Sequence, residues 1–176
     1  MKIRVLTVVD TEIYLNLRLE ALKQDPESFS ASYEDIMSQP DPKTYKAQHL
    51  SNKDNIVLGA FMNNELMGVA TLETKSLVKQ EHTCKVAAVF VSNRARGLGL
   101  GKALILACIE LAKNMRLEQM TLSVVVGNHS ARRLYDSLGF KTFGVLKNSL
   151  KFNNQYWDQE HMVLYFNQEM GAVSSY

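Results

Sequence analysis

The spacing of apolar and polar residues predicts alternating strands and helices along the chain. Residues 3–9 form a β-branched run typical of a strand, and a helix follows from Asp10 or Thr11 to about Asp25, with apolar side chains at helical spacing. Residues 26–52 are polar, contain all three prolines, and predict loops with one or two short helices.

The next part of the chain has the pattern of strands. Residues 56–62 and 66–77 flank the turn Asn63-Asn64 and predict an antiparallel hairpin, which the strand 82–91 extends. Residues 86–91 are entirely apolar, as in a central strand covered on both faces. The remaining predicted elements are a helix at 99–115, a strand at 120–126, a helix from Asn128 or Ser130 to Gly139, and strands at 140–145 and 156–166.

Length and composition are those of one globular domain. The chain has 176 residues, of which 46% are hydrophobic and 22% charged, so disorder is excluded as its main state. We expect one domain at 1–166 and a C-terminal tail at 167–176. The net charge of +2 gives no reason to expect a nucleic-acid partner, and we find neither a signal peptide nor eighteen consecutive apolar residues. We therefore expect a cytoplasmic protein with no membrane partner.

The two cysteines support neither a disulfide framework nor a metal site. Cys84 and Cys108 have no second Cys or His beside them at metal-ligand spacing. Cys108 lies on the apolar side of the predicted helix 99–115 and is expected in the core. Cys84 begins a strand and is expected to be partly exposed.

A glycine-rich turn between the predicted strand 82–91 and the helix 99–115 has the properties of an anion site. Gly97, Gly99 and Gly101 let the backbone approach a ligand, and the first N–H groups of a helix point at an anion with the helix dipole behind them. Arg94, Arg96 and Lys102 add positive charge. The sequence therefore predicts a phosphate-binding loop, although a turn without any ligand stays open at this point.

Two common nucleotide motifs are excluded by spacing. A dinucleotide fingerprint needs a third glycine where this chain has Lys102 or Leu104, according to which glycine is counted first. A Walker loop needs Ser or Thr after Gly101-Lys102 and a glycine at position 96, where Ala103 and Arg96 stand.

Three motifs in order make the chain resemble the GNAT family of acetyl-coenzyme A-dependent N-acetyltransferases. The first is Arg96-x-x-Gly99-x-Gly101, after a strand that ends at Val91. The second and third are Asn128-x-x-Ala131-x-x-Leu134-Tyr135-x-x-x-Gly139-Phe140 and Tyr156-x-Asp158-x-x-x-Met162. The resemblance implies an α/β (α+β) fold: a mixed, mostly antiparallel sheet of about seven strands, with a parallel splayed pair and helices on both faces.

The resemblance also implies acetyl-CoA as co-substrate, with no metal. Backbone groups of the strand at 89–91 would bind the pantetheine arm, N–H groups of the glycine loop would bind the pyrophosphate, and Asn128 would contact pantetheine, although Asn128 also suits a plain helix cap. The implied cofactor-binding residues are Val89, Phe90, Val91, Arg96, Gly97, Leu98, Gly99, Leu100, Gly101, Lys102, Asn128 and Tyr135.

Catalysis requires a proton donor for the leaving thiolate and an acceptor for the amine proton. The resemblance assigns the donor to Tyr135. The strand at 85–90 has no acidic residue, although some family members place a Glu there to act as base. Glu73 on the preceding strand is our candidate base, because alternate residues of a neighbouring strand can face the same cleft; His82 and Glu34 are further candidates.

The acceptor pocket is implied to lie between residues 29–33 and 147–157. Ser28, Ser30, Ser32, Tyr33, Tyr156 and Trp157 give these segments hydroxyl and aromatic groups without a dense acidic cluster. A polycationic acceptor is therefore disfavoured, and a small amine, an amino-acid-like molecule or a peptide N-terminus is expected. Proteins of this kind are often dimers, so a homodimer is compatible with the sequence.

The leading hypothesis is an enzyme in which the amine attacks acetyl-CoA directly in a ternary complex. A non-catalytic acyl-CoA-binding sensor is the alternative, and the missing strand carboxylate favours it slightly. A scaffold that binds no nucleotide is the third hypothesis.

Overall fold

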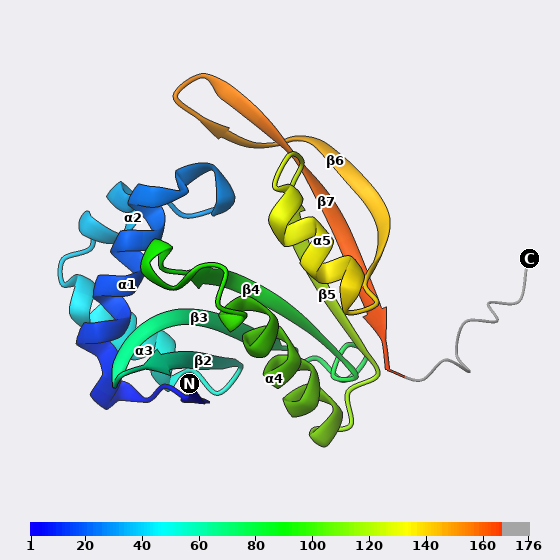
Figure 1. Ribbon diagram of the computed structural model, residues 1–176, viewed down its shortest axis with the longest axis horizontal. Helices are drawn as coiled ribbons and strands as arrows, with labels where there is room; N and C mark the ends of the chain where they lie inside the picture. Colours follow the sequence, from blue (N-terminus) through cyan, green and yellow to red (C-terminus); the bar gives the residue numbers. More distant parts are fainter. Residues whose placement is uncertain (167–176) are drawn as a thin grey trace, which may run out of the picture.

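The computed structural model describes residues 1–166, in which seven strands form one sheet with the order β1-β2-β3-β4-β5-β7-β6 (Figure 1). The β4–β5 pair is parallel, and the other neighbouring strands are antiparallel. The predicted mixed, mostly antiparallel sheet is therefore confirmed. The elements are β1 (Lys2–Val5), α1 (Thr11–Gln24), α2 (Tyr33–Met37), α3 (Pro42–Ser51), β2 (Asn55–Met62), β3 (Glu65–Thr74), β4 (Thr83–Val91), α4 (Leu100–Asn114), β5 (Gln119–Val125), α5 (His129–Ser137), β6 (Lys141–Phe152) and β7 (Gln155–Tyr165).

Helices cover both faces of the sheet, as predicted. On one face, Tyr14, Leu17 and Ala21 of α1 pack in a buried cluster with residues of β2 and β3. On the other face, α4 contributes Leu104 and Cys108 to a second, larger cluster that also contains residues of α5 and the central strands. The sheet therefore separates two hydrophobic cores, and burial of apolar area on both sides stabilises its central strands.

A β-bulge interrupts β4 near its carboxyl end. Thr71 of β3 pairs with Ala87, but Val69 pairs with Phe90, so two residues of β4 lie opposite the single residue between them on β3. Ala88, within the bulge, has a φ of 54°, in the left-handed region that non-glycine residues rarely adopt. A bulge bends its strand and increases the local twist.

β4 and β5 are paired only at their amino ends. The parallel ladder runs from Thr83↔Gln119 to Lys85↔Thr121, after which β4 continues beside β3 and β5 continues beside β7. The bulge in β4 lies just beyond the last pair, where the strands separate. Figure 1 shows the two strands diverging, with α4 below the gap and α5 beside β5.

Three predicted strand boundaries are wrong, and the smallest difference is in β3, which ends at Thr74 and not at residue 77. The first strand ends at Val5, not at residue 9, because the Asp10 carboxylate accepts hydrogen bonds from Arg4 (2.7 Å) and from the Thr7 backbone N–H (2.9 Å), which closes a short 3-10 turn at Val8–Asp10. β6 continues to Phe152 instead of ending near residue 145. The turn at Asn153 and Asn154, both with positive φ, connects β6 to β7 in a long hairpin.

Cys84 is buried, which corrects the expectation that it is partly exposed. Only 2% of its surface is exposed, because its side chain faces the cluster beneath α4. Burial raises the pKa of the Cys84 thiol to about 12, so the thiolate is not formed at neutral pH.

The predicted tail at 167–176 lies outside the described residues. None of the helices within residues 1–166 is long and apolar enough to cross a membrane.

Candidate active site

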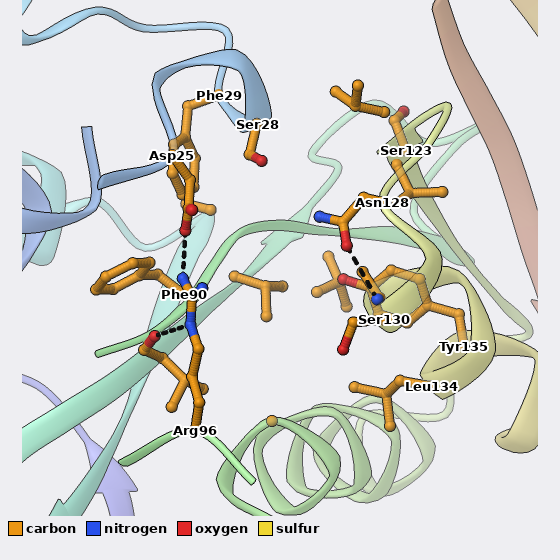
Figure 2. Close-up of a pocket in the computed structure, with 18 of the residues that line it drawn as sticks. Asp25, Ser28, Phe29, Phe90, Arg96, Ser123, Asn128, Ser130, Leu134 and Tyr135 are labelled. Carbon is orange, nitrogen blue, oxygen red and sulfur yellow. Dashed lines mark hydrogen bonds and ion pairs between the residues drawn. The ribbon is translucent and has the colours of Figure 1, made fainter. Parts of the chain in front are cut away.

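A cavity of about 680 Å³ occupies the space between the separated ends of β4 and β5. One side is formed by the segment that follows α1 and by the strand and loop at 86–102, and the other by β5 and α5. Figure 2 shows Asp25, Phe29, Phe90 and Arg96 on one side, facing Ser123, Asn128 and Tyr135 across the cavity. The predicted cofactor residues that line it are Val89, Phe90, Val91, Arg96, Gly97, Gly99, Leu100, Gly101, Lys102, Asn128 and Tyr135.

The amino end of α4 opens onto this cavity without a side-chain cap. Gly99 is the N-cap residue, with a φ of 81°, and no side chain accepts a hydrogen bond from the first turn. The N–H of Ala103 is bonded to the Gly99 carbonyl at 3.0 Å, which leaves the N–H groups of the three residues between them without an intrahelical partner. Free N–H groups with the helix dipole behind them suit a pyrophosphate.

Arg96 connects the glycine loop to the end of α1. Its guanidinium forms an ion pair with Asp25, and its Nε donates a hydrogen bond to the Val91 carbonyl oxygen at 3.1 Å. The guanidinium also lies 5.9 Å from the centre of the Phe90 ring. Arg96 is therefore held in place by the protein, whereas Lys102 is exposed and forms no ion pair among residues 1–166.

Asn128 caps α5, and its position is also compatible with the ligand contact considered for it. Its Oδ1 accepts a hydrogen bond from the Ala131 N–H at 3.1 Å and caps α5. The amide nitrogen is not needed for the cap, and Figure 2 shows it on the side of the cavity. The same side chain can therefore begin the helix and donate a hydrogen bond to a ligand in the cavity.

Tyr135 lies in the wall of the cavity, on the face of the sheet that α4 covers. It is 6% exposed, and its ring centre is 5.9 Å from that of Phe140 in an edge-to-face arrangement. Burial raises the pKa of Tyr135 to about 12, with the nearby Cys108 thiol contributing in the same direction. Tyr135 therefore keeps its proton at neutral pH and can donate it to an anion that forms in the cavity.

Some predicted site residues lie elsewhere. Glu73 lines neither this cavity nor a second one that adjoins it, because it pairs with Lys85, where β4 is still joined to β5. A position on the strand next to β4 does not by itself bring Glu73 to the cavity, since only the carboxyl-terminal part of β4 borders it. Leu98 points to solvent and is 58% exposed, and His82, just before β4, lines neither cavity. Glu34 lines the second cavity only.

The second cavity, of about 990 Å³, lies between the segment after α1 and the far end of the β6–β7 hairpin. These are the two segments predicted to bind the acceptor. Glu27, Phe29 and Trp157 line both cavities and mark where they meet. Among residues 1–166, no group of three or more His, Cys, Asp or Glu side chains is placed to hold a metal ion.

The sequence analysis did not identify Asp25, Glu27 and Ser123 as site residues. Asp25 and Glu27 follow α1, more than sixty residues before the glycine loop, and nothing in their local pattern indicates the contact with Arg96 or with the cavity. Ser123 stands in an apolar strand, where a single hydroxyl is a weak indication that one face of the strand borders a cavity.

Two relatives are similar to this chain over most of its sequence. An N-alpha-acetyltransferase from Sulfurisphaera tokodaii is 34% identical over 108 residues, which are 60% of this chain and 63% of the relative. The L-amino acid N-acetyltransferase AaaT from Escherichia coli is 26% identical over 133 residues, which are 74% of this chain and 82% of the relative. The chain thus spans just under two thirds of the length of the first of these relatives.

The fold is that of solved acetyltransferases. The structure of yncA from Salmonella typhimurium, solved with its cofactor acetyl-CoA, superposes with a TM-score of 0.79 at 21% identity and covers 99% of this chain and 98% of its own. The family model for the acetyltransferase (GNAT) family matches residues 19–140, which include the C-terminal part of α1, the glycine loop and α5. The predicted resemblance is confirmed, and the chain belongs to the GNAT acetyltransferase family.

Proposed function

We propose that this protein transfers the acetyl group of acetyl-CoA to the α-amine of an amino-acid-like molecule or of a peptide N-terminus. One observation supports this most directly: a single cavity has the uncapped amino end of α4 and the buried, protonated Tyr135 in its walls, and meets a second cavity at Glu27, Phe29 and Trp157. A donor and an acceptor entering from the two cavities would meet at that junction.

The pyrophosphate of acetyl-CoA would bind the free N–H groups of Leu100, Gly101 and Lys102. The pantetheine arm would then follow β4. The Ser92 N–H bonds the Met67 carbonyl of β3, so strand alternation turns the N–H of Val91 toward the cavity. Ala88 and Val89 have no partner on β3, and their N–H groups are candidate donors to the thioester oxygen, on which negative charge develops during attack.

Tyr135 would donate its proton to the departing thiolate. A pKa of about 12 keeps the phenol protonated at neutral pH, so that it can hydrogen-bond to the sulfur and supply a proton as negative charge develops there. Coenzyme A is a fairly good leaving group, so the donor accelerates the reaction without being indispensable to it.

The acceptor class rests on charge and on amine chemistry. An α-amine has a pKa of about 7.7–8.0 and a useful neutral fraction at pH 7, whereas an alkyl amine of pKa about 10.4 is almost fully protonated. Glu27 places a carboxylate at the junction, where an ammonium group would approach, and the second cavity is lined by basic as well as acidic side chains, Lys23, Lys151, Glu34 and Asp35. The names of the two relatives also denote N-alpha- and L-amino acid acetylation.

The test is release of coenzyme A thiol from acetyl-CoA with three groups of acceptors: free L-amino acids, short peptides with a free N-terminus, and simple alkyl amines. We expect turnover with the first or second group and at least tenfold lower kcat/KM with alkyl amines. Peptides with a blocked N-terminus are the matched control. Binding of coenzyme A without turnover on any acceptor would instead support the acyl-CoA-binding sensor.

A further inference from the structure

A serine and a histidine on neighbouring strands form a hydrogen-bonded pair at the edge of the cofactor cavity. Ser123 of β5 lines the cavity, and its Oγ lies 2.9 Å from Nδ1 of His161 on β7. The two residues are direct partners in the antiparallel register, so their side chains lie on the same face of the sheet. His161 is partly buried and itself lines neither cavity.

Ser123 lies where β5 separates from β4. Thr121 is the last residue of β5 that pairs with β4, and Ser123, two residues further on, is on the same face of the sheet as Thr121. The pyrophosphate site lies toward the other end of β4, so a pantetheine arm that follows β4 from there brings its thioester toward Ser123.

Ser123 and Tyr135 lie on opposite faces of the sheet. Leu122 and Val124, the neighbours of Ser123, belong to the same buried cluster as Tyr135 and α4. Alternation along the strand therefore turns Ser123 toward the face that α1 covers. Trp157, which lines both cavities, is on this face too, since it precedes His161 by four residues along β7. A thioester bound between the two strands would therefore have Tyr135 on one side and the Ser123 hydroxyl on the other.

We propose that Ser123 and His161 accept the proton of the attacking amine during acetyl transfer. This inference rests on the proposed function. The amine nitrogen bonds the acetyl carbon and the C–S bond breaks. The amine proton passes to Ser123 Oγ as the Ser123 proton passes to Nδ1 of His161, and the thiolate takes the proton of Tyr135. Exchange with water then removes the added proton from His161 and restores that of Tyr135.

The cavity offers few competing proton acceptors. Asp25 and Glu27 are the acidic residues that line it. Asp25 is engaged in the ion pair with Arg96. Glu27 lies at the junction with the second cavity, where its charge attracts the ammonium form of the acceptor, and its replacement by Gln should raise KM. His161, which acts through Ser123, is a positioning residue and the final acceptor of the proton.

Substitutions at Ser123 separate the hydroxyl from the shape of the side chain. Ser123→Val and Ser123→Thr add β-branched residues that suit a strand, and only Thr keeps the hydroxyl. We expect kcat to fall about 10²-fold in Ser123→Val, a typical size for lost proton transfer, and to be largely kept in Ser123→Thr. His161→Gln should lose as much as Ser123→Val. The control is His129→Gln, at an exposed residue that lines neither cavity.

The double variant Ser123→Val/His161→Gln gives the sharpest result. If Ser123 and His161 act as one relay, either single substitution already removes the whole relay. The double variant should therefore be no slower than either single variant, with an unchanged Kd for acetyl-CoA. Equal kcat in His161→Gln and wild type, or losses that multiply in the double variant, would overturn the relay. Failure of the wild type itself to release thiol with any acceptor would instead overturn the proposed function.

Discussion

Replacing Gly101 by Ala should stabilise the free protein and weaken its binding of coenzyme A. A Cβ at this position would lie 3.5 Å from Leu134 Cδ2 and 3.8 Å from Val91 Cγ2, both ordinary contact distances. Gly101 is in the first turn of α4 and does not have a positive φ. Alanine is favoured over glycine by about 0.8–1.0 kcal/mol inside a helix, and we expect somewhat less, about 0.5 kcal/mol, in a first turn. For a domain of this size that raises Tm by about 1–2 °C.

The same methyl group would occupy space in the cofactor cavity, beside the N–H groups assigned to the pyrophosphate. A tenfold rise in Kd corresponds to about 1.4 kcal/mol. Coenzyme A at a hundredfold excess over its wild-type Kd should stabilise the wild type by about 2.7 kcal/mol and the variant by about half as much. Thermal unfolding with and without coenzyme A, together with calorimetric titration, measures both effects. Gly101→Asp adds a negative charge at the same place and should abolish binding.

Gly99→Ala is the matched comparison. Its Cβ would meet nothing within 4 Å, but the φ of 81° places it in the left-handed region, which costs an L-residue about 1–2 kcal/mol. Gly99→Ala should therefore lower Tm while Gly101→Ala raises it. An unchanged Kd in Gly101→Ala would refute the pyrophosphate assignment, and a lowered Tm in that variant would refute the helical geometry on which the reasoning depends.

Three further predictions concern buried groups. Tyr135→Phe should lower kcat by about 10²-fold with an unchanged Kd for acetyl-CoA, in stopped-time thiol assays. Burial, with Lys46 and Arg18 adding to it, lowers the pKa of His49 to about 4, so stability is lost as pH falls from about 6.5 toward 4. Discounted for partial exposure, the loss is about 1–2 kcal/mol, and urea unfolding of His49→Gln should not show it. Arg18→Met removes a buried cation and should raise the pKa of His49 in NMR titration.

The arrangement of strands and helices could be predicted because each element has its own local signal. The β-branched and apolar runs, the turn at Asn63 and Asn64, and the cap at Asn128 are read from neighbouring residues, and the structure agrees with them. The boundaries that were wrong depend on contacts or turns outside the run itself. β1 ends where Asp10 binds Arg4, and β6 extends because it pairs with β7 over the whole hairpin.

For the site, the glycine loop and the two segments around the second cavity were predictable from the sequence, and the candidate base was not. The glycine loop and α5 are continuous segments, so the spacing of their own residues indicates a phosphate-binding loop and a helix that carries Tyr135. Glu73 failed as a candidate because its position depends on how far β4 and β5 stay paired, which is a property of the sheet. The bulge at Ala88 contains no glycine and gives no signal in the sequence.

The sequence by itself determined the order of the elements, the family and the loop that suits a pyrophosphate, since all three follow from residue types at short spacing. Tertiary structure decided which residues share the cavity. Asp25 binds Arg96 of the glycine loop, Glu27 lines the same cavity, and Ser123 meets His161. These contacts depend on the separation of β4 from β5, on strand register and on the packing of α1 and α4 on opposite faces of the sheet. Such contacts join residues more than thirty positions apart, and local patterns contain no information on them.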